Sequence, residues 1–247
     1  LPVDSEHSAI HQCLRSGTSG EIERITLTAS GGPLRRLSAA ALEKVTPQQA
    51  LRHPTWSMGA RVSLDSATLM NKGFEVIEAC HLFGLGDERV EVLVHPQSIL
   101  HSMVEFVDGS TIAQLGPPDM RIPIQYALTY PQRLERPGMR LKLEEVGSLE
   151  FEVPDHRRFP CLGLARQAWR QGGTATVALN AADEVALAAF VQGKIRFTAI
   201  AAVVEEAMTA LAASSAGSDA ALSVEAVVAA DAEARRLAAD FVALRAL

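Results

Sequence analysis

The spacing of apolar and polar residues in the first half of the chain predicts a mixed α and β domain. Short β-branched runs predict strands at 24–28, 90–94, 104–107 and 111–115. Asp108-Gly109-Ser110 lies between the last two runs and is typical of a β-hairpin turn. Helical spacing predicts helices at about 39–44, 66–83 and 121–129. We expect these elements to form an α/β (α+β) domain around a small, mostly parallel sheet.

The last ninety or so residues have a different pattern, which predicts only helices. Pro160 suits a first helical position, and Gly172-Gly173 suits the end of that helix. The remaining signals are a helix at 178–192 closed by Gly193, and capping residues at Thr198 and Ser223. Four helices with short loops favour a four-helix bundle.

Two prolines and a glycine interrupt the chain between these halves, at 130–138. We therefore expect a mixed α and β domain over 1–129, a connecting segment over 130–154 and an all-α C-terminal domain over 155–247.

Composition narrows the class of protein. Of the 247 residues, 48% are hydrophobic and 21% are charged, which is ordinary for a globular protein. A net charge of −6 argues against a nucleic-acid partner. No apolar run approaches the roughly 20 residues that cross a bilayer, so we expect no membrane span. The cysteines (Cys13, Cys80 and Cys161) are dispersed, which predicts a reducing, cytoplasmic environment.

Two polar segments combine residue types that suit metal and phosphate chemistry. Asp4-Ser5-Glu6 and Glu75 offer carboxylate oxygens, the ligands of hard cations such as Mg²⁺ or Mn²⁺. Lys72 beside Asn71 suits a phosphate group. Each segment also has a simpler interpretation. The first is typical of a helix N-terminus, and the second of a solvated, charged helix face.

Three further features are candidates for the site. Gly73 lies within a predicted helix at a cost of about 1 kcal/mol, which a close approach of backbone or ligand would explain. Ser30-Gly31-Gly32 follows a strand and suits either an anion-binding turn or a plain loop. Residues 53–59, which include His53, Trp56 and Gly59, suit a lid over a substrate or a loop anchored by its tryptophan. His95 and His101 are expected to be structural.

In their order along the chain, these motifs resemble the 1-deoxy-D-xylulose 5-phosphate reductoisomerase family. The resemblance covers essentially the whole chain. It rests on Leu1-Pro2-Val3-Asp4-Ser5-Glu6-His7, Thr28-Ala29-Ser30-Gly31-Gly32-Pro33, the segments 53–59 and 65–75, His95-Pro96-Gln97-Ser98, Pro118-Asp119-Met120-Arg121 and Leu179-Asn180-Ala181-Ala182-Asp183-Glu184.

The resemblance implies that residues 1–129 form the catalytic, metal- and substrate-binding domain, and it implies a role for each matching residue. The metal ligands would be Asp4, Glu6 and Glu75. The substrate-binding residues would be Ser5, Glu6, Ser30, His53, Trp56, Ser66, Asn71, Lys72 and Glu75, and of these Glu6, His53, Lys72 and Glu75 would be catalytic. Gly59 would lie near the nicotinamide cofactor, and 53–59 would form a mobile lid.

The implied reaction is the rearrangement of 1-deoxy-D-xylulose 5-phosphate and its NADPH-dependent reduction to 2-C-methyl-D-erythritol 4-phosphate, in the non-mevalonate isoprenoid pathway. The implied cofactors are Mn²⁺ or Mg²⁺ and NADPH. The partners would be a sugar phosphate and a second copy of the chain. Two alternatives remain open: a redox-free, metal-dependent sugar-phosphate isomerase or lyase, and a non-catalytic binding module.

The chain departs from the family in one respect. Members carry an N-terminal Rossmann-type domain for NADPH, but no Gly-x-Gly-x-x-Gly follows a first strand here. We therefore expect a fragment without the cofactor domain, which binds metal but turns over negligibly by itself.

Overall fold

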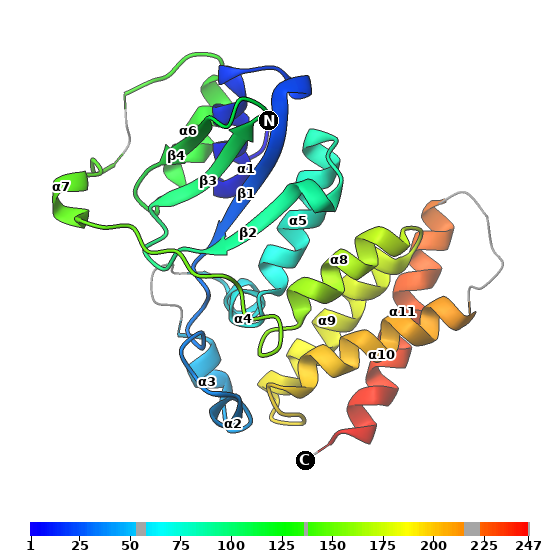
Figure 1. The fold of residues 1–247 in the computed structure, drawn as a ribbon. Helices are drawn as coiled ribbons and strands as arrows, with labels where there is room; N and C mark the ends of the chain where they lie inside the picture. Colours follow the sequence, from blue (N-terminus) through cyan, green and yellow to red (C-terminus); the bar gives the residue numbers. More distant parts are fainter. Residues whose placement is uncertain (53–57, 136–137, 215–222, 247) are drawn as a thin grey trace. The chain divides into compact units, whose positions relative to one another are not determined.

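The computed structural model describes residues 1–52, 58–135, 138–214 and 223–246, which form two compact units (Figure 1). The described residues of the first unit come from Leu1–Gly31 and Glu78–Pro154. Those of the second come from Gly32–Pro54, Met58–Ile77 and Asp155–Leu247. The division into a catalytic domain, a connecting segment and a helical domain stays a prediction.

A four-stranded sheet organises the first unit, with the order β2-β1-β3-β4. The strands are β1 (Ile22–Ala29), β2 (Val90–Val94), β3 (Leu100–Phe106) and β4 (Thr111–Leu115). The expected small sheet is confirmed, but it is mixed rather than mostly parallel. Only β1 and β2 run parallel, whereas β3 is antiparallel to both β1 and β4.

Short connections explain why the sheet is mixed. Residues 95–99 join β2 to β3, and so few residues cannot form the crossover that a parallel return requires. Gly109 has φ 83°, and the backbone N–H of Ser110 donates to Asp108 Oδ1 over 2.8 Å. This turn reverses the chain between β3 and β4, as the sequence predicts. His101 lies within β3.

Helix α1 (Ser5–Cys13) packs against β3 and β4 and contacts α6 (Arg121–Thr129). Ala9 and Ile10 of α1 and Ile25 and Leu27 of β1 are buried, so the core of this unit lies between the helix and the sheet. The short helix α7 (Leu143–Val146) follows, and then Glu152 pairs with Val94 at the end of β2.

Four helices of the second unit confirm the expected C-terminal bundle: α8 (Cys161–Gln171), α9 (Ala175–Val191), α10 (Ala199–Ser214) and α11 (Val224–Leu244). Helix α9 contacts the other three. Ala178, Ala181 and Ala182 are buried on it, and such small side chains let neighbouring helices approach closely. Ser223 caps α11 by accepting from the N–H of Ala226, as the sequence predicts.

The helix predicted over 66–83 is in fact two helices, α4 (Ala60–Thr68) and α5 (Met70–Phe83). Leu69 separates them with φ 62°, in the left-handed region that a leucine seldom adopts. Thr68 Oγ1 donates to the carbonyl of Asp65 and accepts from the N–H of Met70. The chain thus changes direction immediately before Asn71 and Lys72.

The other short elements are α2 (Ala39–Leu42), α3 (Pro47–Ala50), η1 (Leu14–Ser16), η2 (Ser19–Glu21) and η3 (Asp87–Arg89). None of the described helices is both long and apolar enough to cross a bilayer.

Candidate functional site

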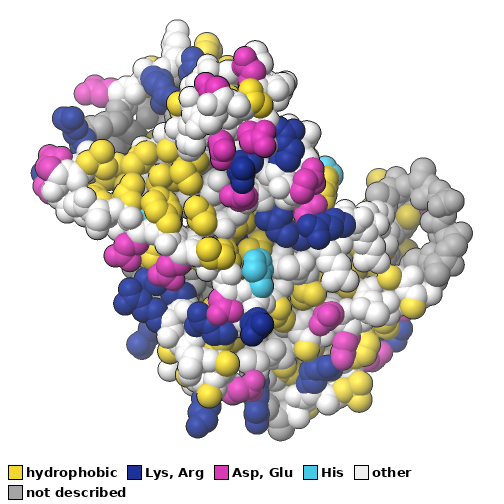
Figure 2. All heavy atoms as spheres, viewed as in Figure 1, with side chains coloured by type: hydrophobic (Ala, Val, Ile, Leu, Met, Phe, Trp, Pro, Cys, Tyr) yellow, Lys and Arg dark blue, Asp and Glu magenta, His cyan; other side chains and the backbone are white. Residues whose placement is uncertain are grey.

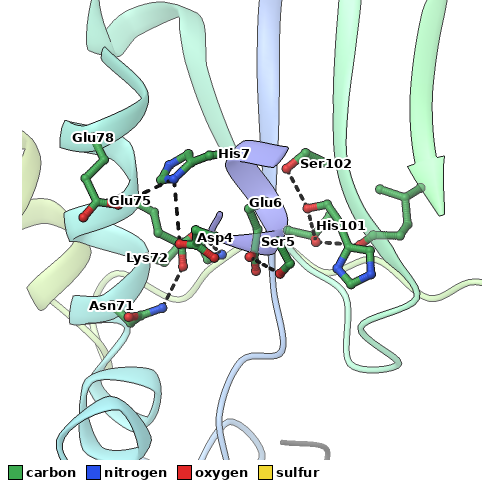
Figure 3. A network of polar contacts seen from close by, with 12 residues as sticks. Asp4, Ser5, Glu6, His7, Asn71, Lys72, Glu75, Glu78, His101 and Ser102 are labelled. Atoms are coloured by element: carbon green, nitrogen blue, oxygen red, sulfur yellow. Dashed lines mark hydrogen bonds and ion pairs between the residues drawn. The ribbon is translucent and has the colours of Figure 1, made fainter. Parts of the chain in front are cut away.

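The start of α1 presents two of the predicted metal ligands. Asp4 occupies the N-cap position, but its side chain makes no capping hydrogen bond. Instead its Oδ2 lies 3.7 Å from Nδ1 of His7, and the same nitrogen lies 3.6 Å from Oε2 of Glu78 (Figure 3). Asp4 therefore occupies the N-cap position that the simpler interpretation expects, but its carboxylate contacts His7.

Asp4, His7 and Glu78 form a group whose candidate ligand atoms all lie within 4.8 Å of one another. His7 is only 2% exposed, so its ring is held in place between the two acids. Sequence reasoning missed this group. The spacing of Asp4 and His7 was a signal for it, because residues three apart share one side of a helix.

Ser5 and Glu6 interact directly at the same helix end. Ser5 Oγ donates to Glu6 Oε2 over 2.5 Å, and Ser5 itself is buried. A hydroxyl donor on one oxygen limits how the carboxylate of Glu6 can turn. The pair therefore presents an oriented acid rather than a freely rotating one.

The first turns of α5 hold the other predicted residues together. Glu75 accepts two hydrogen bonds, one per oxygen: Asn71 Nδ2 donates to Oε1 over 2.6 Å and Lys72 Nζ to Oε2 over 2.5 Å (Figure 3). Lys72 is 4% exposed and Glu75 is 2% exposed. The alternative of a solvated helix face is therefore wrong for these two residues. Burying an ion pair costs several kcal/mol per ion before the mutual attraction offsets it.

Helix α5 continues from this cluster to Glu78. Glu75 and Glu78 are three residues apart, so their side chains lie on the same side of the helix. The helix therefore carries the buried acid one turn before the acid that contacts His7.

Gly73 is explained by helix packing. A Cβ at this position would lie 2.6 Å from Cβ of Ala165 and 3.5 Å from the carbonyl oxygen of Cys161, both on α8. The expected close approach is thus confirmed, and the neighbour is a helix of the same unit.

The Ser30-Gly31-Gly32 turn also needs its glycines. Gly31 and Gly32 have φ 79° and 66°, which favour glycine. A Cβ on Gly32 would lie 2.6 Å from the carbonyl oxygen of Ser66. The turn therefore packs directly on the segment that carries Ser66, a predicted substrate-binding residue at the end of α4.

The predicted lid is only partly described. His53 and Trp56 lie within 53–57, outside the described residues. Gly59 is exposed at the N-cap of α4, and a Cβ there would meet no atom within 4 Å. Gly59 is thus accessible beside the N-terminus of a nine-residue helix.

His95 lies buried at the end of β2. Its Nδ1 lies 2.8 Å from the carbonyl oxygen of Glu150, and its ring stacks on Phe151. These contacts fix the segment before Pro154 to the sheet, in keeping with the structural role expected for His95.

An ionic network joins α4, α9 and α11, and sequence reasoning missed it. Arg61 donates to Asn180 Oδ1 over 2.6 Å and also pairs with Glu184, which in turn pairs with Arg235. Asp65 and Asp183 are buried next to this network. Asp65, Asn180, Asp183 and Glu184 belong to motifs of the resemblance, whereas Arg61 lies between two of them. The meeting of these residues in space had no signal in the sequence.

Two family models match the chain. Residues 1–83 match the 1-deoxy-D-xylulose 5-phosphate reductoisomerase C-terminal domain, and residues 115–237 match the DXP reductoisomerase C-terminal domain. The two matches contain the acids of α1, the cluster on α5 and most of the helical bundle.

Named relatives agree with the family models. The 1-deoxy-D-xylulose 5-phosphate reductoisomerase of Xanthomonas campestris pv. campestris (strain 8004) is 57% identical over 96% of this chain and 59% of its own length. That of Xanthomonas oryzae pv. oryzae (strain PXO99A) is 55% identical over 100% of this chain and 61% of its own length. The chain thus spans about three fifths of the length of these relatives.

Solved structures give the same result. The enzyme of that name from Zymomonas mobilis, in complex with NADPH, matches with a TM-score of 0.89 and 46% identity over 98% of this chain and 61% of that chain. A DOX-P reductoisomerase in complex with NADPH, fosmidomycin and magnesium matches with a TM-score of 0.92 and 43% identity over 99% and 63%. This chain belongs to the 1-deoxy-D-xylulose 5-phosphate reductoisomerase family.

Proposed function

We propose that the chain supplies the metal- and substrate-binding part of an NADPH-dependent reductoisomerase. The reaction is the rearrangement of 1-deoxy-D-xylulose 5-phosphate followed by reduction to 2-C-methyl-D-erythritol 4-phosphate. The observation that carries this proposal is the buried cluster of Asn71, Lys72 and Glu75 on α5. Burying Lys72 and Glu75 costs desolvation free energy, and the resulting cluster offers fixed charged groups that suit a charged ligand.

The proposed metal ligands are Asp4, Glu6 and Glu75. Their donors are all carboxylate oxygens, the set that Mg²⁺ and Mn²⁺ accept, and a donor fixes an oxygen of Glu6 and both oxygens of Glu75. Preorganised acids of this kind fit a hard divalent cation. When bound, the cation would supply Lewis-acid polarisation of substrate oxygens. His7, beside Asp4, orients that carboxylate.

The proposed phosphate anchors are Ser30, Ser66, Asn71 and Lys72. Lys72 contributes a compact positive charge, and Asn71 contributes an amide donor one residue earlier. Binding energy gained at the phosphate holds the reacting carbons of the substrate in place. This positioning lowers the activation barrier of the reaction, although the phosphate itself does not react. Ser5 and Glu6 act at the reacting end, where the hydroxyl of Ser5 keeps the acid oriented.

The lid and the cofactor complete the proposal. His53 and Trp56 would close over the substrate and exclude water. Gly59 would face the nicotinamide of NADPH, since it is exposed and leaves open space at its Cβ position. NADPH would supply the hydride. We further propose that Glu6, His53, Lys72 and Glu75 are the catalytic residues.

A chimera tests this function. The N-terminal part of the Xanthomonas campestris relative, which lies outside the matched region, is joined ahead of Leu1. We expect this chimera to consume NADPH in the presence of Mn²⁺ and 1-deoxy-D-xylulose 5-phosphate, and its Glu75→Gln variant to lose this activity. A folded chimera that binds NADPH without turnover would contradict the proposal. Product formation without NADPH would instead favour a redox-free isomerase or lyase.

We also propose that the chain forms a homodimer. Strand β4 lies at the edge of the sheet, and Ile112 on it is 38% exposed. Hydrophobic side chains gather on the visible face of the first unit (Figure 2), and exposed ones of its later part include Met139, Leu143 and Val153. Light scattering should give twice the monomer mass, and Ile112→Lys should lower it.

We propose a cytoplasmic location, because Cys13, Cys80 and Cys161 are all buried and are dispersed along the chain rather than spaced as a disulfide framework. Fractionation of cells of the source organism would test it, since recovery outside the cytoplasmic fraction would contradict it.

A further inference from the structure

Two acidic side chains of the second unit are buried against each other, and most of their carboxylate oxygens lack a hydrogen-bond donor among the described residues. Asp65 on α4 is 4% exposed and Asp183 on α9 is 0% exposed. Oδ1 of Asp65 and both carboxylate oxygens of Asp183 find no hydrogen-bond donor among the described residues. Buried polar atoms are nearly always hydrogen-bonded, so these three oxygens require an explanation.

Among the described residues around the pair, Arg61 is the one whose positive charge lies directly beside a carboxylate. Arg61 Nε lies 3.6 Å from Asp65 Oδ2, and its other nitrogens are directed to Asn180 and Glu184. Arg235 of α11 forms ion pairs with Glu184 and Asp231. Burial raises the pKa of the Cys161 thiol on α8, so that group adds no charge.

A shared proton satisfies this arrangement. Two carboxylates in contact cannot both ionise in a buried site, because their charges repel and water does not screen them. A carboxylic acid, in contrast, offers one O–H donor to its neighbour. We infer that Asp183 keeps its proton at neutral pH and donates it to Asp65, so that the two side chains clasp α9 to α4 and position the segment carrying Ser66.

The pKa shifts agree with the proton lying on Asp183. Burial raises the pKa of Asp183 well above its ordinary value, and the negative charge of Asp65 raises it further. Burial also raises the pKa of Asp65, but the hydrogen bond from Asp183 and the charge of Arg61 oppose that rise. The residue beside the arginine is therefore the acceptor, and the residue farther from it is the acid.

The clasp predicts the direction of one pH effect. Folded Asp183 holds its proton at pH values where an unfolded aspartic acid, with a pKa of about 3.9, has lost it. The folded state then binds more protons than the unfolded state, so stability falls as the pH rises through this window. The folding equilibrium constant changes by up to about tenfold per pH unit there.

The positioning role rests on the proposed function, whereas the shared proton does not. Ser66 follows Asp65 directly in α4, and its carbonyl oxygen supports Gly32. A clasp that fixes Asp65 therefore fixes one proposed phosphate anchor and the turn packed on it. Asp65 and Asp183 act through these neighbours as positioning residues.

Infrared spectroscopy of the wild-type chain tests the proton directly. We expect a carboxylic-acid carbonyl band at neutral pH that is absent from the spectrum of Asp183→Asn. The asparagine amide donates permanently to Asp65, so this variant should fold. Its stability should lack the part of the pH dependence that wild-type stability shows above the ordinary aspartate pKa. Asp240→Asn, at an exposed ion pair with Arg236, is the matched control and should keep the wild-type profile.

The outcomes separate the two claims. A folded wild-type chain without the acid band, or an Asp183→Asn profile equal to that of wild type, would overturn the shared proton. If Asp183→Asn does not fold, the wild-type band alone decides.

The positioning role has its own test. Asp183→Ala should weaken binding of inorganic phosphate about tenfold while Mn²⁺ binding is kept, and unchanged phosphate binding by folded Asp183→Ala would overturn the positioning role. Failure of the proposed function is distinct, because it would appear as unchanged Mn²⁺ affinity in Glu75→Gln.

Discussion

Glu75 and Asp183 are both buried acids of the second unit, yet their surroundings are opposite. Glu75 receives an ammonium donor from Lys72 and an amide donor from Asn71. Asp183 faces another carboxyl group, and its oxygens find no donor among the described residues. Equal burial thus gives two different acids: the first is held as an anion beside its cation, and the second is held neutral.

This difference indicates what each acid can do. A buried anion with fixed oxygens can ligate a cation, because no proton has to leave first. A buried neutral acid donates one hydrogen bond and adds little charge to its surroundings. The neighbours of a carboxyl group, more than its exposure, decide whether it belongs to a charged site or to the framework that supports it.

The largest effect is expected from removing the cation beside Glu75. Lys72→Met leaves Glu75 buried with a negative charge and without the ammonium group of Lys72, so the free energy of unfolding should drop by about 3–5 kcal/mol. Urea unfolding followed by circular dichroism measures this. Adding Glu75→Gln to Lys72→Met should restore much of the loss. A single Lys72→Met variant as stable as wild type would show that the pair is not buried in solution.

The next effect concerns ligand binding. Glu75→Gln removes an anionic oxygen but keeps an acceptor for Lys72, so Mn²⁺ affinity should fall by at least about tenfold, or 1.4 kcal/mol. Isothermal titration calorimetry of the 247-residue chain measures it. Asp183→Asn is the matched control, because a neutral acid contributes no metal ligand, and its Mn²⁺ affinity should equal that of wild type. Equal affinity in Glu75→Gln would exclude Glu75 as a ligand.

Truncation of the neutral acid should destabilise the chain less than Lys72→Met. Asp183→Ala removes the donor to Asp65 and leaves that acceptor buried, at a cost of about 1–3 kcal/mol. Asp183→Asn keeps a donor and should lie close to wild type at neutral pH. The two variants compared in urea unfolding separate loss of the hydrogen bond from loss of the acid. An Asp183→Asn variant as unstable as Asp183→Ala would speak against a donor at this position.

The smallest effect tests the support of the charged cluster. Gly73→Ala places a methyl group against Ala165, and overpacking of this kind should cost about 1–2 kcal/mol. Gly163→Ala is the control, because a Cβ there meets nothing within 4 Å and alanine favours the helix. Thermal unfolding of both variants gives the comparison. Equal stability of the two would mean that α5 and α8 are not in close contact.

The sequence predicts local elements well where local signals decide them. Strand β2 and helix α6 begin and end where the pattern places them, and the Asp108-Gly109-Ser110 turn forms. The pairing direction of the strands was predicted less well. It depends on the length of the connection 95–99 between β2 and β3, and not on the sequence of any single strand. Gly73 shows an intermediate case, in which the sequence indicated a close neighbour but not which one.

The same limit applies to the candidate site. Asn71, Lys72 and Glu75 lie within two helical turns, so their contact follows from helix spacing. Asp65 and Asp183 meet only because α4 packs on α9, and nothing in either motif signals the other. The Asp4, His7 and Glu78 group is intermediate, because helix spacing brings Asp4 and His7 together whereas Glu78 lies on α5, far along the chain. The roles proposed for individual residues remain predictions.

The left-handed backbone of Leu69 has a consequence for mutational tolerance. In an ordinary core position, valine and isoleucine are among the best replacements for leucine. At Leu69 they should be among the worst, because β-branched side chains seldom adopt positive φ. Glycine and asparagine, which are poor core residues, accept that backbone more readily. A library of all substitutions at position 69, sorted for folded protein, should therefore rank polar asparagine above apolar isoleucine.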